Sequence, residues 1–215
     1  MTTSATKSET GRRYWERHAK RYDRSTRLLS RPIPRMLELA VEAAEDNERV
    51  LEVAAGTGLI TTAIAPVVGE LIATDYAAAM VKQLEARVRE AGISNVRCEQ
   101  ADLYALRFDA GSFDAVFAAN VLHLVPDLER ALANLRRMLQ PGGVLVAPTY
   151  LHKETLGASM LSRVFALTGF PGQRRFTSTT LRAAIEAAGF AVTRTEIIPG
   201  PFPIGYIEAA APLTS

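Results

Sequence analysis

Short apolar runs alternate with amphipathic helical patterns along this 215-residue sequence, and this alternation restricts the fold more than any other feature. Five runs have the length of buried strands, at residues 50–53, 71–74, 96–98, 115–118 and 144–147. Apolar residues at helical spacing lie between several of these runs. Buried strands separated by helices are typical of a parallel sheet that is covered on both faces. The sequence therefore predicts an α/β fold.

The pattern changes after the fifth apolar run. Residues 151–176 read as an irregular insertion with one helical stretch, and a further helix is expected to end at Gly189, a suitable residue for a helix C-terminus. Two final apolar runs, 191–198 and 203–209, are separated by a short turn rich in proline and glycine. A parallel crossover needs about a dozen residues or more, so this short connection predicts antiparallel neighbours.

The N-terminal part of the chain is predicted to be a disordered tail over residues 1–10, followed by a helical segment over 11–46. The aromatic side chains of this segment fall on one helical face, and they are Tyr14, Trp15, His18 and Tyr22. Such a face suits a lid over a binding site. A helix that is simply docked on the sheet is the alternative.

Charge and cysteine content limit the classes of partner and compartment. The net charge of +2 does not indicate a nucleic-acid-binding surface, and the basic residues near the N-terminus are interspersed with acidic ones. The single cysteine, Cys98, excludes an intrachain disulfide and favours the cytoplasm, where it is expected to act as a small buried apolar side chain. No apolar run approaches the roughly 18 residues of a membrane span, which leaves only peripheral membrane contact open.

The strongest local motif is a glycine loop directly after the first apolar run. Gly56 and Gly58 lie between that strand and a helical pattern. Glycine lets the backbone approach a ligand closely, and a helix start offers free N–H groups. This arrangement suits a dinucleotide or another adenosine cofactor, with a plain tight turn as the alternative.

Two acidic residues follow the next two predicted strands. Asp75 ends the second strand, where a carboxylate can accept hydrogen bonds from both ribose hydroxyls. Asp102 follows the third strand, where it can accept from an adenine amino group. A helix cap is the alternative role for either residue. Thr61 stands where the dinucleotide fingerprint has its third glycine, which disfavours a nicotinamide cofactor.

Five segments in this order resemble the motifs of the class I S-adenosylmethionine-dependent methyltransferases, at residues 50–58, 75–80, 101–103, 113–123 and 139–143. The resemblance is to the small-molecule branch, which includes ubiquinone/menaquinone-biosynthesis and phospholipid methyltransferases. Ala54 replaces the first glycine of the most frequent pattern, which still leaves a small residue at the cofactor.

The resemblance implies a Rossmann-like seven-stranded sheet, mostly parallel with an antiparallel last strand, in one domain over residues 11–215. It implies S-adenosylmethionine as cofactor and S-adenosylhomocysteine as product. The residues expected to contact the cofactor are Glu52, Ala54, Gly56, Gly58, Asp75, Tyr76, Met80, Asp102, Leu103, Asn120, Tyr14 and Tyr22.

Methyl transfer from a sulfonium is an in-line displacement, for which alignment and electrostatics supply most of the rate. Neither a catalytic triad nor a metal-ligand cluster is visible in the sequence. His123, after the fourth predicted strand, is the candidate general base; a histidine that packs beside the cofactor is the alternative.

The acceptor is expected to be a small molecule, because the fourth-strand segment lacks the Asn-Pro-Pro-aromatic motif associated with methylating bases or protein amides. The insertion at 151–176 is read either as the wall of an apolar pocket with a basic entrance or as a capping helix. A pocket of that kind suits a lipid, a quinone precursor or an anionic metabolite. A non-catalytic S-adenosylmethionine-binding module and an NAD-dependent oxidoreductase are the alternative functions.

Overall fold

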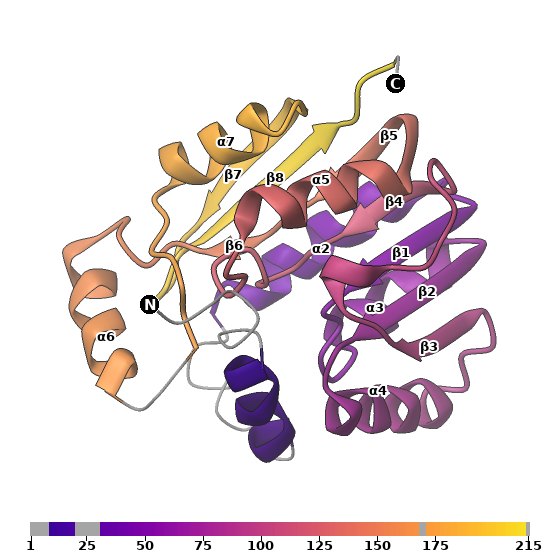
Figure 1. The fold of residues 1–215 in the computed structure, drawn as a ribbon, viewed down its shortest axis with the longest axis horizontal. Coiled ribbons are helices and arrows are strands. Elements are labelled where there is room, and N and C mark those ends of the chain that lie inside the picture. The colour runs from indigo at the N-terminus through magenta and orange to yellow at the C-terminus, as the bar shows by residue number, and fades with distance from the viewer. Residues whose placement is uncertain (1–8, 20–30, 168–170, 214–215) are drawn as a thin grey trace.

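One sheet runs through the middle of the protein, with helices packed on both of its faces (Figure 1). The computed structural model describes residues 9–19, 31–167 and 171–213. In chain order the elements after the N-terminal helix are α2 (Ile33–Ala44), β1 (Arg49–Val53), α3 (Leu59–Ile64), η2 (Ala65–Val67), β2 (Glu70–Asp75), α4 (Ala78–Glu90), β3 (Val96–Gln100), η3 (Leu103–Ala105), β4 (Phe113–Phe117), α5 (Leu128–Met138), β5 (Leu139–Val146), β6 (Thr149–Tyr150), α6 (Leu156–Leu167), α7 (Ser178–Ala187), β7 (Ala191–Ile198) and β8 (Ile204–Ala210).

The predicted parallel sheet is confirmed. Strands β3, β2, β1, β4 and β5 lie side by side in that order, and all four of their pairings are parallel. Each of the five apolar runs falls on one of these strands. Four of the five residues of β1 are buried, because helices cover both faces of this central strand.

The predicted C-terminal hairpin is also confirmed. Strand β8 runs antiparallel to both β5 and β7, so it is the reversed strand of the sheet. Within the described residues the sheet has eight strands and not seven, because β6 is assigned separately from β5. Thr149 pairs with Gly205 of β8 in the same register as Val146 pairs with Glu208 of β8. Strand β6 is therefore a continuation of β5 along the same partner strand. Pro148 lies at the interruption, where it has no N–H to donate to the ladder.

Two helical layers enclose the sheet. Helices α2 and α3 pack on one face, where Leu39 and Ile64 join Phe117 in an apolar core. Helices α5 and α7 pack on the other face, through residues such as Leu132 and Ile185. The helix expected before 189 ends as predicted, because Gly189 follows its C-terminus in a left-handed conformation with φ of 86°.

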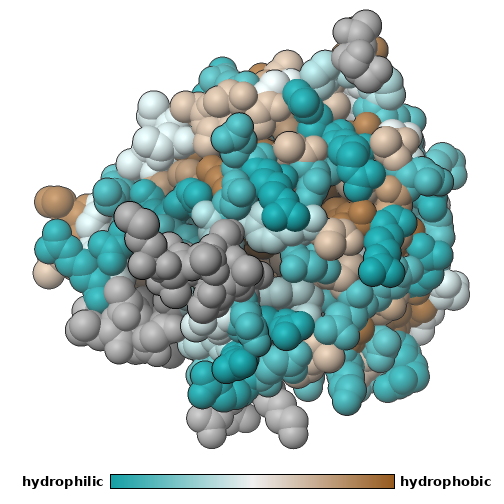
Figure 2. All heavy atoms as spheres, viewed as in Figure 1, coloured by the Kyte–Doolittle hydropathy of each residue, from teal (hydrophilic) through white to brown (hydrophobic). Residues whose placement is uncertain are grey.

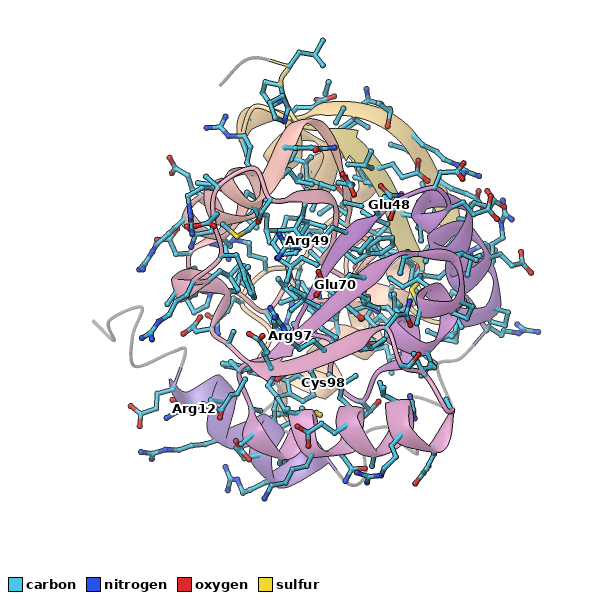
Figure 3. The ribbon with its side chains drawn as sticks, turned by 90° about the vertical axis from the view of Figure 1, so that its right-hand side faces the viewer. Arg12, Glu48, Arg49, Glu70, Arg97 and Cys98 are labelled. Carbon is cyan, nitrogen blue, oxygen red and sulfur yellow. The ribbon has the colours of Figure 1, made fainter. Side chains whose placement is uncertain are left out.

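Strand β3 forms one edge of the sheet, with Cys98 half-buried on it (Figure 3). Cys98 packs against Leu84 and Val88 of α4, in agreement with its predicted role as a small apolar side chain. Burial raises the pKa of its thiol to about 11, which keeps it protonated. Arg97 and Glu99 pair at 2.6 Å on the same strand, and charged side chains on an edge disfavour pairing with another sheet.

The flanking segments agree in part with the expectations. Residues 9–19 are helical, so Glu9 and Thr10 belong to the N-terminal helix and not to the expected disordered tail. Residues 1–8 and Tyr22 lie outside the described residues. In the insertion, Leu156 and Met160 of α6 are 87% and 69% exposed. Figure 2 shows a few brown atoms beside teal ones at the end of the molecule where Figure 1 draws α6. The role of this insertion as the wall of an acceptor pocket stays a prediction. No helix in the described part of the chain is long and apolar enough to cross a membrane.

Candidate functional site

The glycine loop after β1 takes up left-handed backbone at three of its five residues. Ala54, Gly56 and Gly58 have φ of 53°, 58° and 86°. A Cβ placed on Gly58 would approach Leu84 of α4 to 2.6 Å, so the packing of α4 against the loop requires a glycine at this position. A Cβ on Gly56 would meet no atom within 4 Å. The loop therefore presents open space at Gly56, where a ligand can approach the backbone.

Asp75, at the end of β2, is bound to that loop. Its Oδ2 accepts a 3.0 Å hydrogen bond from the N–H of Gly56, and its Oδ1 accepts one of 2.9 Å from Ala77. The side chain is 5% exposed, and burial raises its pKa to about 6, against the effect of these two hydrogen bonds; the charge of Glu16 raises it further. Asp75 is not the cap of α4, because the N-cap residue of that helix is Ala77. An ionised carboxylate has about four acceptor positions, so this one can accept further hydrogen bonds.

Glu52 lies behind the loop and is 2% exposed. The hydroxyl of Thr61 donates a 2.5 Å hydrogen bond to its Oε2. Burial raises the pKa of Glu52 to about 8, the Thr61 bond opposes this shift, and the nearby Asp75 adds to it. The glutamic acid is therefore mainly protonated at neutral pH. The same contact explains position 61, where a glycine would leave Glu52 without this partner.

Asp102 and Leu103 follow β3 at the same edge of the sheet. Asp102 caps the short helix η3, because its Oδ1 accepts a 2.9 Å hydrogen bond from the N–H of Tyr104. Its side chain is nonetheless exposed, whereas Leu103 is buried. The cap, one of the two predicted roles of Asp102, is thus observed, and a contact with adenine stays a prediction.

The segment after β4 brings Asn120 and His123 to the neighbouring part of this edge. Asn120 has a left-handed backbone with φ of 51°, and its buried Oδ1 accepts no hydrogen bond from any residue that the structure describes. His123 is 2% exposed, and burial lowers the pKa of its imidazole to about 3, with a further contribution from His152. Its ring lies 5.1 Å from that of His152 and 6.2 Å from that of Tyr150.

The N-terminal helix covers the segment that follows β2. Glu16 accepts hydrogen bonds from the first N–H groups of α4, at 2.7 Å from Ala78 and 3.1 Å from Ala79. Trp15 packs in a small cluster with Ala19, Ala77 and Met80, to which Tyr76 also belongs. Tyr14 stacks on His18 within the helix, with 4.1 Å between ring centroids.

Several of the residues that shape this edge were not expected from the sequence. Glu16 is 62 residues from its partner Ala78, and His152 is 29 residues from His123. Arg174 lies in the insertion read as a pocket wall with a basic entrance or as a capping helix, and its guanidinium donates to the carbonyls of Val125 and Pro126 and holds the loop after β4. No local sequence signal marks these long-range contacts.

Comparison with known proteins gives a family match over the central part of the chain. Residues 51–147 match the family model described as Methyltransferase domain. The chain is 39% identical to the demethylmenaquinone methyltransferase of Thermus thermophilus over 136 residues, which cover 60% of each protein. It is 34% identical to the ubiquinone/menaquinone biosynthesis C-methyltransferase UbiE of Stutzerimonas stutzeri over 135 residues, 60% of this chain and 53% of that protein. The chain thus spans about half to two-thirds of the length of these relatives.

The fold is also found among solved structures. The YcgJ protein of Bacillus subtilis superposes with a TM-score of 0.72 at 18% identity, over 83% of this chain and 98% of that one. At this identity the likeness concerns the fold alone, and the family match rests on the sequence comparisons. The glycine loop after β1, Asp75 and the β3 and β4 segments lie within the matched residues. The match over residues 51–147, together with these relatives, supports a class I S-adenosylmethionine-dependent methyltransferase domain in this part of the chain.

Proposed function

We propose that this chain transfers the methyl group of S-adenosylmethionine to a small-molecule acceptor. The observation that carries the proposal is the carboxylate of Asp75, which is held by the N–H of Gly56 beside a loop with open space in front of its backbone. S-adenosylmethionine supplies a methyl group on a positively charged sulfur and leaves as S-adenosylhomocysteine. The residues of the chain have to bind this donor, exclude water and align an acceptor with it.

The residues at this edge fit such a donor. Asp75 accepts hydrogen bonds from the ribose hydroxyls through its remaining acceptor positions. Asn120 offers a buried carbonyl oxygen that needs a donor, because an unpaired buried polar atom costs free energy. Leu103 and Met80 are apolar and buried, as contacts to an adenine ring require.

The other proposed cofactor contacts follow from the same placement. Glu52, Ala54, Gly56 and Gly58 lie on the β1 side of the site, where the amino-acid part of the donor is proposed to bind. Tyr76 and Asp102 are proposed to contact the adenosine. Tyr14 on the N-terminal helix is proposed to cover the donor, and Tyr22 carries the same proposal from the sequence alone.

The acceptor class is proposed from two considerations. Both curated relatives described above are named for methylation in quinone biosynthesis, and the sequence segment after β4 lacks the Asn-Pro-Pro-aromatic motif. We therefore propose a lipid, a quinone precursor or a similar metabolite, not a nucleic acid. A cytoplasmic place of action is proposed because the single cysteine excludes an intrachain disulfide.

Calorimetric titration with S-adenosylhomocysteine, and separately with NADH, tests the cofactor. Binding of the first and not of the second supports the proposal, and absence of S-adenosylhomocysteine binding at millimolar concentration contradicts it. Transfer of a tritiated methyl group to a panel of hydroquinones, phenols and fatty acids then separates an enzyme from a non-catalytic binding module. A non-catalytic binding module binds S-adenosylhomocysteine but transfers no tritiated methyl group to any of these acceptors.

A further inference from the structure

His152 is a buried histidine whose polar atoms are unsatisfied. It lies two residues after β6 and is 7% exposed. Neither Nδ1 nor Nε2 has a hydrogen-bond partner among the described residues. A neutral imidazole carries one N–H donor and one acceptor nitrogen, and buried polar groups in native proteins almost always have partners. Two unpaired ring nitrogens on one buried side chain indicate a site that a ligand completes.

The surroundings of His152 are aromatic. Its ring lies 5.1 Å from the ring of His123 and 5.0 Å from that of Phe202, between centroids. Tyr150 is 6.2 Å from both of these neighbours. These rings form a wall that suits a planar ligand, and the imidazole of His152 is one of its polar groups. His123, at 2% exposure, is the more deeply buried member of the histidine pair.

The aromatic cluster of His123, Tyr150, His152 and Phe202 lies opposite the proposed donor site in the sheet. The glycine loop, Asp75 and Asp102 follow β1, β2 and β3, on one side of the point where the strand order reverses. His123 follows β4, and His152 follows β6, which continues β5; both therefore lie on the other side. Ligands in open α/β sheets bind across this point, outside the carboxyl ends of the strands. A donor bound on the first side thus has its acceptor on the side of His152.

The cluster is also held in place by backbone contacts. The carbonyl of His123 accepts hydrogen bonds from the N–H groups of Gln173 at 2.9 Å and Arg174 at 3.1 Å, and Lys153 donates to the carbonyl of Phe176 at 3.1 Å. The segment after α6 is therefore fixed against the segments that carry both histidines. Burial, together with the charge of Arg175, lowers the pKa of His152 to about 4, so its imidazole is neutral near pH 7 and offers one unprotonated ring nitrogen to a hydroxyl donor.

We propose that His152 binds the hydroxyl group of an aromatic or enolic acceptor and takes its proton during methyl transfer. This inference rests on the proposed function and adds the acceptor chemistry and the residue that recognises it. The hydroxyl proton passes to the unprotonated ring nitrogen of His152, which later releases it to water. The electron pair left on the acceptor forms the bond to the methyl carbon, while the methyl–sulfur bond breaks and its electrons stay on sulfur.

Phenol and toluene test the recognition step without any need for turnover. They have nearly the same shape, but phenol alone can donate a hydrogen bond. We expect the full chain, saturated with S-adenosylhomocysteine, to bind phenol about tenfold more tightly than toluene. In His152→Phe the two affinities should become equal through the loss of phenol binding, with toluene changed less than about twofold. Equal affinities in the unchanged protein, or a phenol preference that survives in His152→Phe, would overturn the proposal.

Nitrogen chemical shifts of the histidine rings provide a second readout that does not depend on a folded variant. Phenol should move the ¹⁵N signal of the acceptor nitrogen of His152, and toluene should leave it in place. An unmoved signal at saturating phenol counts against the proposal. Binding of S-adenosylhomocysteine is measured on the same samples. If S-adenosylhomocysteine binds but phenol does not shift the His152 signal, only the role of His152 is contradicted. If S-adenosylhomocysteine does not bind, the proposed function itself is contradicted.

Discussion

The N–H of Gly56 donates a 3.0 Å hydrogen bond to the carboxylate of Asp75, which joins the loop after β1 to the end of β2. This bond positions a buried carboxylate beside the open face of the glycine loop. It also means that the glycine loop and the acid, which the sequence presents as separate motifs, form one unit in the fold.

Replacement of Asp75 by asparagine tests that unit. Asp75→Asn keeps the size of the side chain but removes its charge, so charge-assisted hydrogen bonds to ribose, each worth roughly 1.5–3 kcal/mol, are weakened. We expect the dissociation constant of S-adenosylhomocysteine to rise at least about tenfold by calorimetry. Asp109→Asn, at an exposed aspartate, is the control and should have no effect. A change below about threefold in Asp75→Asn would exclude Asp75 from the ribose site.

Cofactor affinity should depend on pH through the same residue. Because the pKa of Asp75 is raised to about 6, the carboxylate is ionised above pH 6 and becomes protonated below it. A ribose site needs the ionised form, so affinity should be constant from pH 7 to 8 and fall by about tenfold per pH unit below 6. Titrations between pH 5 and 8 measure this, and Asp75→Asn should remove the step. A step that persists in the variant belongs to another group.

Folding stability should respond to Glu52 in a defined direction. Burial raises the pKa of Glu52 from 4.5 to about 8, so its ionisation is easier in the unfolded chain than in the folded one. Its contribution to stability is complete below pH 4.5 and is lost as the pH rises through 8. Glu52→Gln cannot ionise. Its unfolding free energy, relative to that of the unchanged protein, should therefore improve between pH 5 and pH 9, by on the order of a few kcal/mol.

Calorimetric unfolding at both pH values measures that difference. The change of the side chain that is hydrogen-bonded to Thr61, from glutamic acid to glutamine, affects the unfolding free energy equally at pH 5 and pH 9. The difference between the effects of Glu52→Gln at the two pH values therefore isolates the ionisation of Glu52. A pH-independent effect of Glu52→Gln would show that Glu52 is not buried as an acid in the folded protein.

Glu16 should hold the N-terminal helix on α4. Its carboxylate accepts from two N–H groups at the start of α4, as the side chain of a helix cap does, and loss of such a cap costs about 1 kcal/mol. Glu16→Ala should therefore speed hydrogen exchange of residues 9–19 by about fivefold. Glu9→Ala is the matched control on the same helix, because it removes only an exposed pair with Arg13. Equal exchange in the two variants would contradict the role of Glu16.

Local residue patterns of this chain predict its strands and turns, whereas its long-range contacts depend on the fold. The parallel strands and the loop with Gly56 and Gly58 depend on local patterns of apolar residues and glycine, and these were predicted with nearly correct bounds. The Thr61–Glu52 bond, the Glu16 contact with α4 and the His123–His152 pair depend on which segments the fold brings together. Such contacts leave no periodic trace, so they become visible only in three dimensions.

The reversed strand β8 sets the order in which the sheet can be completed during synthesis. Strands β1 to β5 leave the ribosome first, and their parallel pairings need nothing that follows them. Strand β7 pairs with β8, and β8 also covers the open edge of β5. A nascent chain that stops before Ile204 thus carries β7 without its partner and an exposed β5 edge, which is the state most prone to pair with another chain.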